Sequence, residues 1–199
     1  MNAKWLVSII ILVFLGTMLS AQTSREQRGK RADEIITKIR RMDLANQILP
    51  LVLTKEQLDK LLPAVEKART EGRKAEEVEY EMLTKLEPSV DTAIKDAFEK
   101  QMLPKQETMV TVASTFKTMR LRREAIIADN VDAVMAVLEK ELNAGQKKAA
   151  ANAVQPSLFD PSLDPTKMSD TQKMRFYVQA ILLDSEAYDV LLQMSTKRK

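Results

Sequence analysis

Leu53-Thr54-Lys55-Glu56-Gln57 begins a helix, and Leu142-Asn143-Ala144-Gly145-Gln146 begins another in the same way. In each stretch an apolar residue precedes a good N-cap residue, and a glutamine stands three positions after the cap. The cap side chain accepts a hydrogen bond from an unpaired backbone N–H, and the glutamine bonds back to the cap, an arrangement called a capping box. Leu53 and Leu142 lie 89 positions apart, which hints at two related halves. These two starts decide the fold class.

Helical patterns fill the chain on both sides of the two caps. Good helix formers dominate the composition, and only 4 of the 199 residues are glycine. No stretch alternates with the two-residue period of a strand, so we expect no sheet. Apolar residues recur at three- and four-residue steps in the segments that we expect to be helical: 32–49, 54–87, 89–102, 105–142, 144–154 and 169–196.

Prolines suggest where these helices end. Pro63 either kinks the second helix or begins it, and the apolar stripe keeps its phase across Pro63, which favours the kink. Pro88 is expected to stop that helix. At 129–130 the next long helix either breaks briefly or runs on. Residues 155–168 contain three prolines and are expected to form an irregular strap. Leu51 and Val52 form an apolar connector that is suited to a hydrophobic staple beside the Thr54 cap.

The first 21 residues have the order of a signal peptide. Lys4 supplies a charge, Trp5–Leu19 is an apolar run, and the small residues Ser20 and Ala21 follow. We expect cleavage after Ala21 and a periplasmic or otherwise extracytoplasmic location. The run is shorter than the roughly 20 residues that span a bilayer. The basic residues after it leave open an uncleaved membrane anchor. The basic arm 22–31 is expected to be flexible, and either contacts anionic lipid or cell wall or is simply solvated.

The composition argues against catalysis and against nucleic-acid binding. The chain has no cysteine and no histidine, and it contains neither a nucleophile elbow nor a glycine-rich phosphate loop. We therefore expect no enzyme activity, no cofactor and no metal site. A net charge of +3 is too small to indicate nucleic acid. The carboxylates within 76–81 alternate with other residues on a helix and are expected to be solvated, as are the arginines within 120–123.

The two capped stretches resemble the twin LTxxQ motifs of the Spy/CpxP family, which are small all-α periplasmic stress proteins and chaperones. Leu53, Thr54 and Gln57 match the first motif completely. Leu142 and Gln146 match the second, in which Asn143 replaces the threonine; asparagine is an equal or better cap. The resemblance covers about 53–154. The chain is longer than the family pattern and lacks histidine, which speaks against the zinc-sensing branch.

The resemblance implies a thin, curved helical monomer, two of which interlock into a cradle with an apolar and basic concave face. We accordingly expect an all-α homodimer of long amphipathic helices that pack as in a coiled coil. They form an elongated hairpin domain at 32–154, with an extra C-terminal helix at 169–196. The implied function is ATP-independent binding of unfolded client proteins, or envelope-stress sensing through a partner protein. The alternative is a structural or scaffolding envelope protein, membrane-bound only through an uncleaved N-terminal segment.

Overall fold

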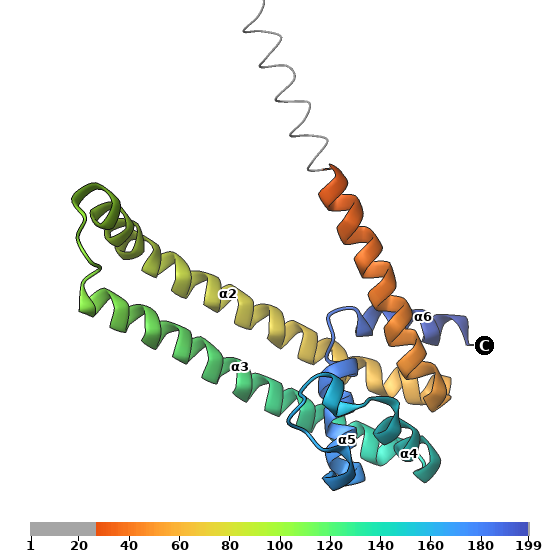
Figure 1. Ribbon diagram of the computed structural model, residues 1–199. Helices are drawn as coiled ribbons and strands as arrows, with labels where there is room; N and C mark the ends of the chain where they lie inside the picture. The colour runs from red at the N-terminus through yellow and green to blue at the C-terminus, as the bar shows by residue number, and fades with distance from the viewer. Residues whose placement is uncertain (1–26, 199) are drawn as a thin grey trace, which may run out of the picture. The chain divides into compact units, whose positions relative to one another are not determined.

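The computed structural model describes residues 27–198 (Figure 1). Every regular element in this range is helical, which confirms the predicted all-α class. The chain divides into two units between Asp43 and Leu44. The expected signal segment 1–21 and its cleavage point after Ala21 lie outside the described residues. Within 27–198 no helix combines the length and the apolar character that a membrane crossing requires.

The first helix covers residues 27–48. The prediction of a flexible arm over 22–31 is therefore wrong for 27–31, while 22–26 lie outside the described residues. The residues at 27–31 are mostly good helix formers, and a guanidinium nitrogen of Arg31 lies 2.7 Å from the Glu34 carboxylate one turn on. In the last turn of the helix Leu44 and Ile48 are buried and belong to the core of the larger unit.

Two long antiparallel helices form the centre of the larger unit. A 3-10 turn, η1 (Leu49–Leu51), leads to helix α2 (Lys55–Lys100), and helix α3 (Gln106–Glu141) returns beside it (Figure 1). The prediction that Pro88 stops the helix is wrong, because α2 runs through both Pro63 and Pro88. Helix α3 likewise continues across 129–130 without a break.

Solvent exposure explains why neither proline ends α2. A proline removes the hydrogen bond to the carbonyl four residues earlier, which costs most where that carbonyl is buried. Pro63 and Pro88 are exposed, and so are the residues whose carbonyls they leave unpaired, Asp59 and Thr84. Water can therefore bind both carbonyls. The helix ends instead at Gln101, which adopts a left-handed conformation (φ 54°).

The larger unit has one core, at the end where α2 begins and α3 finishes. Helix α4 (Ala144–Ala153), the 3-10 turns η2 (Pro156–Leu158) and η3 (Pro165–Lys167), helix α5 (Asp170–Tyr177), the π-helical turn η4 (Val178–Leu182) and helix α6 (Ala187–Lys197) follow α3. Helix α5 packs on α4, and α6 packs on α2. The largest fully buried side chains of this core are Tyr177, Leu44, Ile48, Leu51, Leu58, Leu61, Leu138, Leu182 and Leu191.

The prediction of a single C-terminal helix over 169–196 is wrong. The segment forms α5, η4 and α6, with a turn between the last two in which the Asp184 carboxylate accepts a hydrogen bond from the Glu186 N–H at 2.9 Å. The turn lets the two helices pack on different elements, so that Leu182 and Leu191 are both fully buried. One straight helix would present a single stripe to a single neighbour. Leu192, the neighbour of the buried Leu191, is 40% exposed.

Candidate functional site

Both predicted capping boxes form. The Thr54 hydroxyl accepts from the Gln57 N–H at 3.2 Å, and the Gln57 side-chain oxygen accepts from the Thr54 N–H at 2.9 Å. At the start of α4, Asn143 and Gln146 exchange the same two hydrogen bonds, at 2.9 and 3.0 Å. The apolar residue before each cap, Leu53 or Leu142, is buried. Each stretch therefore fixes the start of one helix and the entry of the chain into it.

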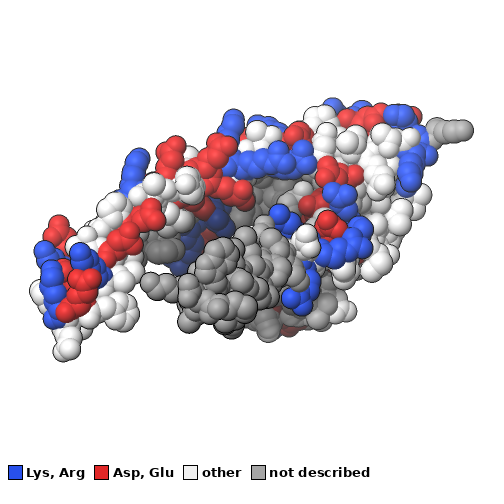
Figure 2. All heavy atoms as spheres, turned by 90° about the horizontal axis from the view of Figure 1, so that it is seen from above, with Lys and Arg blue, Asp and Glu red and all other residues white. Residues whose placement is uncertain are grey.

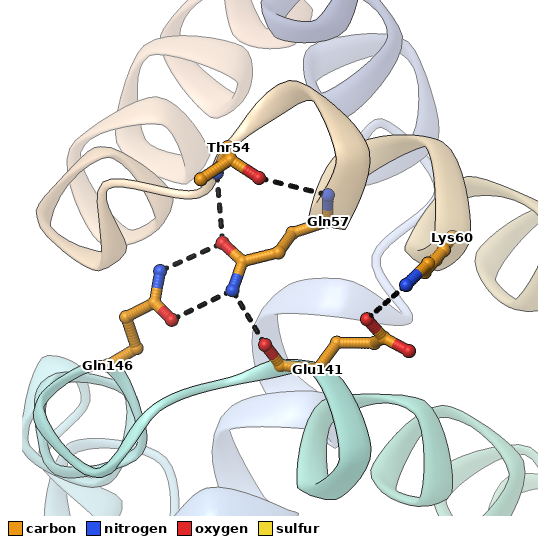
Figure 3. A network of polar contacts seen from close by, with 5 residues as sticks. All are labelled: Thr54, Gln57, Lys60, Glu141 and Gln146. Carbon is orange, nitrogen blue, oxygen red and sulfur yellow. Dashed lines mark hydrogen bonds and ion pairs between the residues drawn. The ribbon is translucent and has the colours of Figure 1, made fainter.

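The structure also brings the two stretches into contact (Figure 3). The side-chain amides of Gln57 and Gln146 face each other and exchange two hydrogen bonds, at 3.0 and 2.9 Å. Gln57 also donates to the Glu141 carbonyl at 2.6 Å, at the end of α3. Beside this pair, the Lys60 ammonium lies 2.7 Å from the Glu141 carboxylate. We call Thr54, Gln57, Asn143 and Gln146 the glutamine junction.

Gln146 ties the junction to the backbone ahead of α2. Its amide nitrogen donates to the Leu51 carbonyl at 3.1 Å and lies 3.4 Å from the Val52 carbonyl oxygen. Val52 has φ 49° and ψ 46°, a left-handed conformation that a β-branched residue adopts only under constraint. Of the connector that the sequence suggests as a hydrophobic staple, Leu51 is buried in the core but Val52 is 69% exposed, and neither directly precedes the cap. Leu53 precedes the cap and is buried in the same cluster as Leu58, the fourth residue of α2.

The glutamine junction has the chemistry of a structural joint. Its side chains are amides and a hydroxyl, which do not titrate near neutral pH and are already engaged with one another or with the backbone. Among the described residues no group of three or more carboxylates, histidines or cysteines is placed to hold a metal ion. The junction therefore positions helices, and a surface for binding has to be sought elsewhere on the molecule.

The outer half of the hairpin, residues 87–129, offers such a surface. Leu86 and Asn130 are buried, but no residue between them is. Large apolar side chains are nevertheless frequent there, and Phe98 and Leu103 are 84% and 91% exposed. Large apolar side chains left in contact with water are typical of surfaces that bind a partner when they lie together on one face.

Helical geometry places most of these side chains on one face. The seam between the helices is marked by the less exposed residues of each, such as Ala93 and Ala97 on α2 and Val112 and Met119 on α3. At 100° per residue, the exposed apolar residues are turned by roughly 50–120° from the seam in the same sense on both helices. Because the helices are antiparallel, both sets point to the same side. We call this set the hairpin face: Tyr80, Leu83, Ile94 and Phe98 on α2, and Met109, Phe116 and Ile127 on α3.

Two other exposed apolar residues of α3 lie away from the hairpin face. Val110 and Leu121 are 59% and 50% exposed, but the same counting turns them by about 100–140° around α3 from Met109, Phe116 and Ile127. On the face drawn in Figure 2, basic and acidic side chains are interspersed and neither sign forms a broad patch.

An ion pair between a buried carboxylate and an exposed arginine joins the two helices of the hairpin. Glu79 on α2 is only 4% exposed, so its expected place on a solvated charged face is wrong. The Arg123 guanidinium of α3 donates hydrogen bonds to both carboxylate oxygens of Glu79, and its Nε lies 2.6 Å from one of them. These hydrogen bonds hold the pKa of the Glu79 carboxyl below its ordinary value and raise the pKa of Arg123. Glu79 follows Ala75 by four residues and precedes Leu86 by seven, a heptad spacing that places it on the seam.

A second polar contact fastens α6 to the start of α2. The Ser195 hydroxyl donates to the Asp59 carboxylate at 2.7 Å, and this bond lowers the pKa of that carboxyl. Farther along α2, the Arg69 guanidinium lies over the Tyr188 ring, 4.5 Å from its centre. The base of the hairpin is thus held by apolar packing and by named polar contacts, whereas its outer half is held only along the seam.

Comparison of the chain with protein-family models, with curated proteins and with solved structures gives no match.

Proposed function

We propose that this protein is an exported, ATP-independent chaperone or stress adaptor that binds unfolded or partner proteins on the hairpin face. The observation that carries the proposal is the exposure of seven large apolar side chains on one side of two paired helices, including Phe98 at 84%. The resemblance of the two capped stretches to LTxxQ motifs supports the same proposal.

The physics of the hairpin favours an unfolded polypeptide as the bound partner. Two helices lying side by side can bury only the seam between them, so the faces on either side stay open to water. Burying one exposed phenylalanine or leucine against an apolar segment contributes about 1.5–3 kcal/mol. Several such contacts suffice for micromolar, reversible binding, which requires no nucleotide. Polar and charged residues between the apolar ones, such as Asp91 and Arg120, keep the free protein soluble.

Light scattering of a heat- or denaturant-unfolded model client, without ATP, tests this proposal. The protein is expected to suppress aggregation at equimolar ratio. The double variant Phe98→Ser/Phe116→Ser removes two apolar side chains of the hairpin face and is expected to abolish suppression. The matched control Val110→Ser/Leu121→Ser removes exposed apolar side chains of α3 that lie outside the hairpin face and is expected to retain it.

Equal loss in both double variants, or none in either, would contradict the hairpin face as the binding surface. The absence of suppression by the unaltered, folded protein would leave the alternative, a scaffolding protein that packs on one dedicated partner. Sedimentation at the assay concentration tests the expected homodimer separately. A dimer that the Phe98→Ser/Phe116→Ser variant dissociates would mean that a second copy covers the hairpin face.

A further inference from the structure

The first helix carries an apolar stripe of its own, which neither the glutamine junction nor the hairpin uses. Ile35, Ile39 and Met42 recur at four- and three-residue steps, and Ile36 lies at the edge of their stripe. These four side chains are 45%, 56%, 61% and 62% exposed for Ile35, Ile39, Met42 and Ile36 respectively. Leu44 and Ile48 lie on the opposite side of the same helix and enter the core. The exposed side chains of the stripe therefore do not contribute to the core that Leu44 and Ile48 enter.

The charge around this stripe is mostly positive. Residues 27–43 contain six basic and three acidic side chains, a net charge of +3 that equals the net charge of the whole chain. Counting 100° per residue places Arg28, Arg31 and Lys38 within or beside the stripe. Long basic side chains beside an apolar stripe can reach sideways to phosphate groups while the apolar residues point into the acyl layer.

The sequence ahead of the helix points to the same kind of partner. Seven residues separate the end of the apolar run Trp5–Leu19 from the first described helical residue, Gln27. In the uncleaved alternative, which the sequence leaves open, that run is held in a bilayer and Gln27 follows within a few residues of the lipid surface. A short stripe with a basic border and an apolar run close upstream has the arrangement of a helix that lies on a lipid surface.

We propose that the helix over residues 27–43 lies on the surface of an anionic lipid bilayer, with Ile35, Ile36, Ile39 and Met42 facing the acyl chains. Anionic lipid attracts each nearby basic residue, and the apolar stripe sets the orientation of the helix. The chaperone proposal does not depend on this contact, because the hairpin face belongs to the other unit. The consequence would be to hold client binding close to a membrane.

Site-specific labelling tests the orientation directly, because the chain has no cysteine of its own. Full-length Ile39→Cys and Asp33→Cys proteins, labelled with an environment-sensitive dye, are reconstituted into phosphatidylglycerol–phosphatidylethanolamine vesicles and into phosphatidylcholine vesicles. Both positions are exposed and lie on different sides of the helix. With phosphatidylglycerol, an aqueous quencher is expected to reach the dye at 39 at least about threefold less well than the dye at 33. High salt is expected to remove the difference.

Two variants in the Ile39→Cys protein complete the test. Met42→Glu interrupts the stripe and is expected to make the dye at 39 accessible, whereas Glu34→Gln changes a charge outside the stripe and is expected to leave it protected. Equal quenching at 33 and 39 in phosphatidylglycerol vesicles overturns the proposal. Protection that is the same in phosphatidylcholine, or that rises with protein concentration in detergent without lipid, also overturns it, the latter by pointing to a second copy of the chain.

Discussion

Replacing Gln146 with alanine is the sharpest test of the glutamine junction. The change removes an amide that is bonded to the Asn143 N–H, to the Gln57 amide and to the Leu51 carbonyl. Because the residue is 9% exposed, water does not replace these partners freely. Gln146→Ala is therefore expected to lower the free energy of unfolding far more than the loss of an ordinary capping glutamine.

The expected magnitude follows from the groups left behind. Losing half of a capping box costs about 0.5–1 kcal/mol. The Leu51 carbonyl and one side of the Gln57 amide lose their partners in half-buried surroundings, at about 1 kcal/mol each. The sum is about 3 kcal/mol. Gln57→Ala removes the same reciprocal pair from the other side, so the two changes are expected to be non-additive by about 1–2 kcal/mol.

The third capping box of the chain supplies a matched control. Gln172 bonds back to Ser169 at the start of α5, at 2.8 Å to the N–H, and is exposed with no partner on another helix among the bonds that the structure records for it. Gln172→Ala is expected to cost only about 0.5–1 kcal/mol. Urea unfolding followed by far-ultraviolet circular dichroism measures the single variants and the Gln57/Gln146 double-mutant cycle. Equal costs for Gln146→Ala and Gln172→Ala, with a coupling energy near zero, would refute the junction as a joint between the two motifs.

Three further outcomes are expected. Val52→Gly relieves a left-handed β-branched residue and is expected to raise the free energy of unfolding by about 1 kcal/mol in the same urea assay; a loss of stability would contradict the strain. Glu79→Gln is expected to cost about 1–3 kcal/mol at pH 7. The folded-state pKa of Glu79 is lowered, so its contribution is present above the unfolded-state value near 4.5 and is lost as pH falls through the folded-state value. Urea midpoints between pH 7 and 3 should thus fall less steeply in the variant, and parallel curves would refute the ion pair. Phe98→Ser is expected to change the free energy of unfolding by less than about 0.5 kcal/mol, because the side chain is 84% exposed; a large loss would show that Phe98 packs in the folded protein.

The helix starts were predictable because their signals are local. Thr54 and Asn143 cap their helices with side chains that bond within three residues, so the sequence alone identifies them. Contact between the two stretches was not predictable from the residues, because it depends on how α2, α3 and α4 pack. The same order of cap and glutamine in both stretches hinted at a relation between two halves. It did not indicate that the side-chain amides of Gln57 and Gln146 exchange hydrogen bonds of 3.0 and 2.9 Å.

The errors share a physical cause, which is that solvent exposure is a tertiary property. Pro88 has the sequence signature of a helix stop, yet Thr84, whose carbonyl it leaves unpaired, is exposed and α2 continues. Glu79 reads as a surface charge, yet its heptad position places it on the seam opposite Arg123. The C-terminal segment reads as one helix, yet α5 and α6 pack on different helices and the chain turns between them. Heptad counting along α2 could have placed Glu79 on the seam. It could not have shown that α2 continues past Pro88 or that the C-terminal segment turns between α5 and α6.

Photo-crosslinking from single cysteines tests the central claim, that the hairpin face binds unfolded protein. Phe98→Cys and Phe116→Cys carry a benzophenone on the hairpin face, and Leu121→Cys and Leu192→Cys carry it at exposed apolar positions outside that face, on α3 and on α6. The account predicts that an unfolded client crosslinks at 98 and 116 and not at 121 or 192. Crosslinking of equal yield at all four positions, or at 121 and 192 alone, would contradict it.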